Sequence, residues 1–223
     1  MLSMIMHTQR NTLRRGIVRT RRRLLIRWAG ADLEPVLQEL GLQVEGSVVE
    51  LASARIEVDR AALPPGRPRL RIDELTGDHG RRAQPPRTLD LAAVGWATVE
   101  LDRAARELGG DWLDAPEDSL LGASTRRRAG ARPALLLLEP NTEGRLAGAL
   151  AHYGEGPIAL YLELPDPKGV AECLRARPGI GPLGSQWLVI GRDPAGPFLI
   201  LVGERATPGN ATAGNANRVP SQP

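Results

Sequence analysis

The sequence predicts an α+β fold in which a unit of one strand, one helix and further strands is repeated along the chain. The clearest stretch is 134–166, where the apolar run 135–138 ends at Glu139-Pro140, as a buried strand would. A helical segment at 143–153 follows, and strand-like alternation returns at 158–164. We therefore expect strand, connecting helix and strand in this stretch.

An internal repeat is the second observation behind the predicted fold. Trp28 and Trp96 are 68 residues apart, and the same gapless offset aligns five further identical pairs. These pairs are Ala29 and Ala97, Leu33 and Leu101, Glu39 and Glu107, Leu40 and Leu108, and Gly41 and Gly109. So many coincidences within one short window indicate a duplicated strand–helix unit.

The first unit is expected at 24–75. A short apolar strand at 24–28 precedes Asp32, which can cap a helix whose apolar stripe recurs at helical spacing and stops at Gly41. Three segments with strand-like alternation follow, interrupted by a Pro-Pro-Gly turn: 43–51, 54–59 and 70–74. The predicted order is strand, helix and three strands.

Two more units are expected after a charged, proline-containing linker at 76–88. The second has a strand at 92–99, a helix from Leu101 to the stop at Gly109, and three strands. Those strands are expected at 112–114, 119–128 and 134–139. The third unit, which repeats less closely, has strands at 158–164, 187–190 and 198–202, with a helix that stops before Pro178.

Three phrases in these units resemble vicinal-oxygen-chelate proteins. They are VGWATVELDRAARELG at 94–109, LLLLEP at 135–140 and GEGPIALYLELPD at 154–166. That family includes glyoxalase I, methylmalonyl-CoA epimerase, extradiol dioxygenases and bleomycin-resistance proteins. The resemblance, which covers roughly 89–204, implies βαβββ modules that pair into one cupped mixed sheet, with helices on its convex face and the active site in the cup.

The resemblance also suggests how the chain is divided. Residues 89–204 form a glyoxalase-like domain of two modules, and 24–75 is a degenerate extra module. This extra module is expected to pack against the sheet edge or to pair with its counterpart in a second chain, which would give a homodimer. The basic arm at 1–23 and the polar tail at 205–223 are expected to be disordered.

In enzymes of this family a divalent metal is held in the cup by residues of the first and last strand of each module. The corresponding positions of this chain carry no oxygen, nitrogen or thiolate donor. They are Ala93, Leu136, Ala159 and Leu201. The three histidines lie outside these strands, at 7, 79 and 152. No metal cofactor is therefore expected.

Strand alternation predicts which side chains face the cup. The predicted ligand-binding residues are Ala93, Gly95, Ala97, Leu136, Leu138, Ala159, Tyr161, Glu163 and Leu201. A mostly apolar hollow with one phenol and one carboxylate is typical of a small-molecule pocket. Glu163 is the candidate catalytic base if burial raises its pKa; the alternative is a rim carboxylate paired with an arginine such as Arg126 or Arg192.

Composition limits the classes of function. The single cysteine, Cys173, excludes an intramolecular disulfide and fits a cytoplasmic protein, and no apolar run is long enough to span a membrane. The function predicted is a metal-free protein that binds a small apolar or amphipathic molecule, and an enzyme is less favoured. The first alternative is a glyoxalase- or epimerase-type lyase or isomerase with a displaced metal site or Glu163 as base. The second is nucleic-acid contact through the arginine-rich arm, which a disordered leader explains more simply.

Overall fold

The computed structural model describes residues 23–30, 32–60, 69–74, 89–141, 143–190 and 196–203. Nearly all of the predicted basic arm, the whole predicted linker and the predicted tail lie outside the described residues, as do His7, His79 and Arg192. The disorder expected for the arm and the tail therefore stays a prediction.

The first unit contains the predicted elements in the predicted order. They are β1 (Leu24–Ala29), α1 (Leu33–Glu39), β2 (Val48–Glu50), β3 (Ala54–Asp59) and β4 (Leu70–Glu74). The four strands form one sheet in the order β2-β3-β1-β4, with β1 parallel to β3 and antiparallel to β4. The fourth strand thus lies on the opposite side of β1 from β2 and β3.

The second and third units form an eight-stranded sheet. The second unit contains β5 (Asp90–Ala97), α2 (Leu101–Leu108), β6 (Trp112–Asp118), β7 (Ala123–Arg128) and β8 (Ala134–Pro140). After α3 (Arg145–Tyr153), the third contains β9 (Gly156–Leu164), α4 (Pro167–Cys173), β10 (Arg177–Gly181), β11 (Gly184–Ile190) and β12 (Phe198–Gly203). In each unit the first strand is parallel to the last, and the two first strands, β5 and β9, are antiparallel neighbours.

The strand order β10-β11-β12-β9-β5-β8-β7-β6 confirms the predicted α+β fold of paired βαβββ modules. The internal repeat is also structural. β1 and β5 end at the aligned residues Ala29 and Ala97, and α1 and α2 begin at the aligned residues Leu33 and Leu101. The duplicated sequence therefore encodes the same strand-to-helix connection twice.

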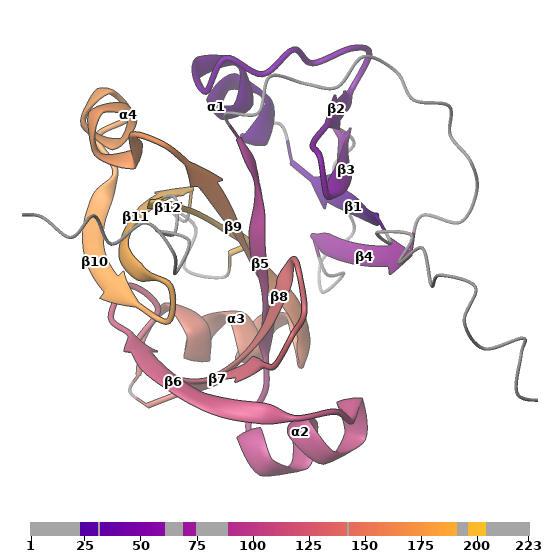
Figure 1. Cartoon of the computed structure of the whole chain (residues 1–223), viewed down its shortest axis with the longest axis vertical. Helices are drawn as coiled ribbons and strands as arrows, with labels where there is room; N and C mark the ends of the chain where they lie inside the picture. Colours follow the sequence, from indigo (N-terminus) through magenta and orange to yellow (C-terminus); the bar gives the residue numbers. More distant parts are fainter. Residues whose placement is uncertain are drawn as a thin grey trace, which may run out of the picture.

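The eight-stranded sheet curls until its two edges meet (Figure 1). The backbone N–H of Ser119, just after β6, donates to the carbonyl of Ile180 in β10 over 2.9 Å, and the Ile180 N–H donates to Ser119 Oγ over 2.9 Å. A Cβ at Gly179 would overlap Leu120, so only glycine allows this close approach. The cup is therefore closed where the edges touch.

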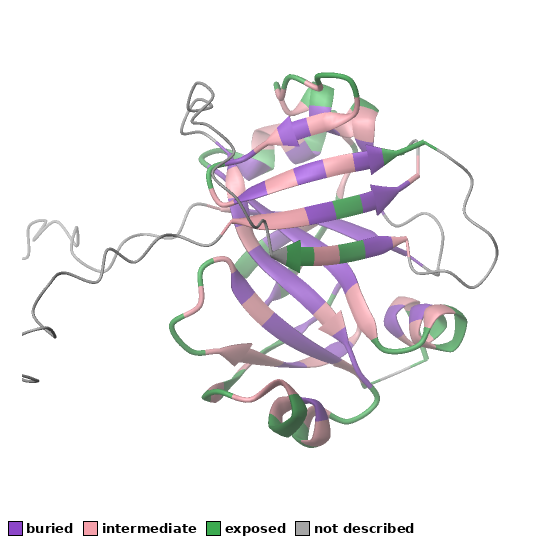
Figure 2. Ribbon diagram, turned by 90° about the vertical axis from the view of Figure 1, so that its right-hand side faces the viewer, coloured by how far each residue is buried: buried purple, intermediate pink, exposed green. Residues whose placement is uncertain are grey.

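The extra unit packs on the outer face of the curled sheet, as Figure 2 shows, and not against its edge. The apolar contact between the two sheets, here named the outer core, is almost fully buried. It includes Ile26, Trp28, Leu33, Leu37 and Ile56 from the extra unit and Leu91, Val94, Leu160, Leu162 and Leu201 from the large sheet. Because this face is covered within one chain, it is unavailable for pairing with a second chain; the predicted homodimer stays a prediction.

The concave face carries its own apolar cluster, here named the inner core. Many of its members come from the central strands β5, β8, β9 and β12: Ala93, Ala97, Leu136, Leu138, Ala159, Tyr161, Phe198, Ile200 and Val202. The turn between β6 and β7 adds Leu120 and Leu121, and α3 adds Leu146 and Ala149. Thus α3 packs on the inner side, whereas the resemblance implied helices on the convex face only; α4 packs Val170 and Leu174 on the outer core as expected.

The predicted inward orientation of Leu201 is wrong. Leu199 and Leu201 belong to the outer core, and Phe198, Ile200 and Val202 face inward. The reason is that five of the six residues of β12 are buried apolar side chains on both faces. A strand buried on both sides has no alternation of polar and apolar residues from which its orientation can be predicted.

Candidate functional site

Seven of the predicted ligand-binding residues lie together and are buried in the inner core: Ala93, Gly95, Ala97, Leu136, Leu138, Ala159 and Tyr161. They fill the hollow themselves. A Cβ at Gly95 would lie 2.7 Å from Leu138 Cδ1 and 3.3 Å from Tyr161 Cε2, so both side chains lie directly over this glycine. A ligand would reach these seven residues only by displacing packed side chains, and their part in binding stays a prediction.

Tyr161 has a structural partner that the sequence did not indicate. Its hydroxyl donates to Asp118 Oδ2 over 2.8 Å, and both groups are fully buried. Asp118 Oδ1 in turn accepts from the backbone N–H groups of Leu120 and Leu121, each at 3.0 Å. Burial, together with the adjacent carboxylate, raises the pKa of Tyr161 well above its usual value, so the phenol stays neutral. The pair fixes the β6–β7 turn inside the cup.

Glu163 differs from the other predicted residues because it lines an open pocket of about 150 Å³. The pocket lies at the end of the cup where β9 and β12 finish and β5 and β8 begin. Its wall is apolar at Leu91, Ala92, Ala134, Leu183 and Val202, and polar at Ser53, Asp90, Arg127, Arg132 and Glu163. It therefore combines an apolar surface with convergent charged groups.

The two carboxylates of this pocket are cross-strand neighbours, since Asp90 of β5 pairs with Glu163 of β9. Asp90 Oδ1 is held by three donors: Ser53 N–H at 2.9 Å, Ser53 Oγ at 2.6 Å and Leu91 N–H at 2.8 Å. These bonds also join the extra unit to the large sheet. Asp90 is thus a residue that connects the two sheets, and Glu163 lies beside it on the neighbouring strand.

The arginines near the pocket differ in their partners. Arg126, which the sequence offered as a partner for Glu163, binds Asp102 and Asp114 instead, and its hydrogen bond to Asp102 is the main reason its pKa is raised. Arg127 and Glu163 each already interact with a neighbour. Within the described part of the chain, Arg132 forms no ion pair, and it is exposed at the pocket rim. Neither Arg132 nor Ser53 could be predicted from the sequence, because both lie in loops outside any periodic pattern.

Ala93, Leu136 and Ala159, three of the positions compared with metal ligands, carry no donor atom and face the inner core; Leu201 faces the outer core. Among the residues that the structure describes, no three or more His, Cys, Asp or Glu side chains come together in a group that could hold a metal ion. His152 is exposed on α3, with its ring edge-to-face against Tyr153 at 4.5 Å between centroids.

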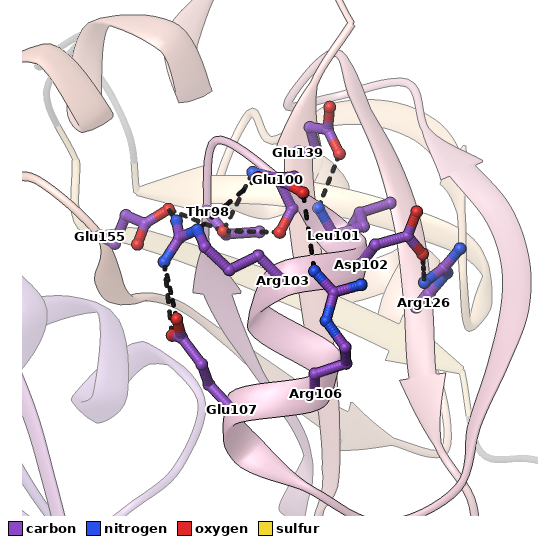
Figure 3. A network of polar contacts seen from close by, with 10 residues as sticks. All are labelled: Thr98, Glu100, Leu101, Asp102, Arg103, Arg106, Glu107, Arg126, Glu139 and Glu155. Carbon is purple, nitrogen blue, oxygen red and sulfur yellow. Dashed lines mark hydrogen bonds and ion pairs between the residues drawn. The ribbon is translucent and has the colours of Figure 1, made fainter.

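A second charged cluster surrounds the start of α2 (Figure 3). Glu139 accepts from the Leu101 N–H at 2.9 Å, and Glu155 accepts from Thr98 Oγ1 at 2.7 Å and the Val99 N–H at 2.8 Å. The pKa of Glu155 is lowered to about 2, first by its hydrogen bond from Arg103 and then by these two donors. Carboxylates that accept from the first N–H groups of a helix stabilise its start, so this cluster has a structural explanation.

The paired modules and their strand order give this chain the vicinal-oxygen-chelate fold. No family model matches the chain, and no curated protein matches it. In the described residues, no helix is long and apolar enough to cross a membrane.

Solved structures that are similar to the chain include two methylmalonyl-CoA epimerases. A variant of the Streptomyces coelicolor enzyme, in complex with 2-nitronate-propionyl-CoA, is 20% identical over 52% of this chain and 97% of its own, with a TM-score of 0.43. The Mycobacterium tuberculosis enzyme is 21% identical over 57% of this chain and 95% of its own, with a TM-score of 0.45. A 4-hydroxymandelate synthase mutant from Streptomyces coelicolor is 16% identical over 81% of this chain and 70% of its own, with a TM-score of 0.38.

Proposed function

We propose that this protein binds, without a metal ion, a small amphipathic molecule that carries an acidic group. The ligand would lie in the pocket beside Glu163, with its acidic group at Arg132. The observation that carries this proposal is the pocket itself, in which an apolar wall and an arginine without an ion-pair partner among the described residues converge. The seven residues of the packed inner core would form the support beneath it.

The size of the pocket limits the size of the ligand. A cavity of about 150 Å³ is comparable to the apolar cavity that holds one benzene molecule, so a ligand of roughly six to ten heavy atoms fits. The wall formed by Leu91, Leu183 and Val202 favours a ring or a branched aliphatic body. A larger ligand would extend past the rim into solvent.

The charges favour an acid over a base. Asp90 is held through its Oδ1 by three donors, and Glu163 and Arg127 already have partners. Arg132 has the planar donor geometry that matches a carboxylate. Because Arg132 is exposed, the gain from this contact is modest, about 1 kcal/mol or roughly fivefold in affinity. The apolar wall would supply the rest.

Titration of the ¹⁵N-labelled protein with benzoate tests the proposal. Binding is followed through the shifts of the backbone amide signals in NMR spectra. We expect the shifts to concentrate around Glu163, Val202 and Leu183, and Arg132→Met to weaken binding about fivefold. Arg106→Met, which removes an exposed arginine on α2, is the matched control and should leave affinity unchanged. Shifts spread over other surfaces, or equal effects of the two variants, would refute the pocket.

Metal retention is measured separately. The protein is incubated with nickel, zinc and manganese salts, desalted, and its metal content determined by mass spectrometry. The positions at Ala93, Leu136 and Ala159 offer no donor, which supports metal-free binding. Stoichiometric retention of any of the three ions would contradict it.

A lyase or isomerase activity with Glu163 as the proton acceptor is the second candidate function. Its supporting observation is that Glu163 lines the pocket and faces a second carboxylate, Asp90, across the strands. Solvent deuterium exchange at the carbon next to the carboxylate of phenylacetate measures such an activity by NMR. Exchange that Glu163→Gln abolishes would favour this candidate, whereas the same rate in both proteins would exclude Glu163 as the base.

A further inference from the structure

Gln186 of β11 is fully buried, yet neither polar atom of its side chain has a hydrogen-bond partner among the described residues. A primary amide offers two N–H donors and an acceptor oxygen. Burying such a group without partners is costly, and almost all buried polar groups in proteins are paired. Gln186 is therefore a polar group in an apolar environment that no internal contact explains.

The side chain of Gln186 points to the inner face of the curled sheet. It alternates with Trp187, which packs on the outer core, and lies on the same face as Leu188, which belongs to the inner core. Gly181 on β10 makes room for it, because a Cβ there would overlap both polar atoms of the Gln186 amide. The amide thus occupies a place that only glycine on the adjacent strand leaves open.

Gln186 continues the row of residues that forms the pocket wall. Across the sheet, Asp90 pairs with Glu163, Glu163 with Val202, and Val202 with Gln186. The first three line the pocket. With neighbouring strands about 4.8 Å apart, Gln186 lies one strand beyond the wall and roughly 10 Å from Glu163 along the sheet.

Leu183 lies at the boundary between the pocket and this region. It belongs to the turn between β10 and β11, lines the pocket and packs on the inner core, and is only partly buried. Because Gln186 does not itself line the pocket, contact between a ligand and its amide requires a change of the Leu183 rotamer. Leucine side chains at partly exposed positions change rotamer readily.

We infer that Gln186 determines ligand specificity by recognising an amide-like group at the end of the ligand remote from Arg132. This inference rests on the proposed function and deepens it. The ligand class becomes an acid whose far end carries a donor and an acceptor side by side, as in a carboxamide, which pairs with the Gln186 amide through two hydrogen bonds. The carboxylate of the same ligand stays at Arg132, on the β8 side of the pocket.

Two probes of nearly the same shape test the inference. 4-Carbamoylbenzoate carries the carboxamide, and 4-isopropylbenzoate replaces it with an apolar group of similar size. We expect the native protein to bind the carbamoyl compound about tenfold more tightly, because two hydrogen bonds to a buried amide replace an apolar contact that leaves the amide unpaired. In Gln186→Met this preference should disappear, while the affinity for benzoate stays unchanged.

Thermal unfolding distinguishes recognition from a structural role. If the amide has no internal partner, Gln186→Met removes an unpaired buried group and should raise Tm by about 2–4 °C. If the amide held the fold together, the same substitution would lower Tm. Gln38→Met, at an exposed position of α1, is the matched control and should leave both Tm and the probe preference unchanged.

These measurements distinguish a failure of the Gln186 inference from a failure of the proposed function. If both probes bind with equal affinity to the native protein and to Gln186→Met, the inference is overturned and the proposed pocket stands. If neither probe nor benzoate binds, the proposed function and the inference both fail. A lower Tm for Gln186→Met together with unchanged probe preference would assign the residue a structural role and also overturn the inference.

Discussion

Removing the hydroxyl of Tyr161 is predicted to destabilise the protein although the ring stays in place. Tyr161→Phe leaves Asp118 Oδ2 without its donor inside the inner core, while Oδ1 keeps the Leu120 and Leu121 N–H groups at 3.0 Å. A hydrogen bond to a charged group contributes about 1.5–3 kcal/mol, and with two donors retained we expect a loss of about 2 kcal/mol. For a chain of this length that corresponds to a fall in Tm of about 4–8 °C.

Urea unfolding followed by circular dichroism measures the free energy of unfolding of both proteins. Tyr153→Phe is the matched control, because Tyr153 is only partly buried and its hydroxyl makes no hydrogen bond to the described residues; we expect a change below about 0.5 kcal/mol. A Tyr161→Phe protein as stable as the control variant would refute the reasoning.

The same residue gives a dependence on pH. Burial and the Asp118 carboxylate raise the pKa of Tyr161 in the folded state, whereas an unfolded tyrosine ionises near pH 10. A raised folded pKa contributes stability that is complete below about pH 10 and is lost as the pH rises above it. The stability difference between wild type and Tyr161→Phe should therefore shrink above pH 10, and a constant difference would show that the phenol is not buried.

Three further predictions follow from other contacts, and a fourth tests the homodimer that the sequence predicts. Glu155→Gln should cost about 1 kcal/mol at pH 7, since the group is partly exposed, and the cost should fade as the pH drops from about 4.5 toward 2; denaturant midpoints across that range measure it. Gly95→Ala should lower stability by about 1–3 kcal/mol, because the added methyl overlaps the packed inner core. Ser53→Ala should cost about 1 kcal/mol by freeing Asp90 of its hydroxyl donor, and both variants can be compared with wild type by urea unfolding. The homodimer predicted from the sequence is tested by light scattering at micromolar concentration; because the apolar face of the extra unit is covered within one chain, it does not follow from the contacts described above, and a monomeric mass would contradict it.

The fold could be predicted because its pattern is local and repeated. The 68-residue offset aligned the end of β1 with that of β5 and the start of α1 with that of α2. The place of β4 could not be predicted in the same way. Its alternating residues specify a strand but not which edge of β1 it joins, and the structure places it on the side opposite β3. Local periodicity predicts elements, whereas pairing depends on contacts remote in sequence.

The candidate site was only partly predictable for a similar reason. Tyr161 and Glu163 share a face of β9, as alternation required, but one is buried and the other lines a pocket. That difference arises from residues remote in sequence: Asp118 accepts the hydrogen bond of the buried Tyr161, whereas Arg132 and Ser53 line the pocket together with Glu163. Loops carry no periodic pattern, so their contribution to a site cannot be derived from spacing. Gln186 could have been noticed as a polar residue in a strand of apolar ones.

The packed cup and the pocket at its end have a common physical cause. Donor groups around an ion need a hollow, and the side chains at Ala93, Leu136 and Ala159 cannot coordinate anything. Apolar side chains that face one another across a curled sheet gain by excluding water, so they pack together with Tyr161, Leu120 and α3 as a buried cluster. The pocket of about 150 Å³ lies instead where the strands end and loops supply charges. A binding function of this chain would therefore use the rim of the cup, where Glu163 and Arg132 meet the apolar wall, and not its centre.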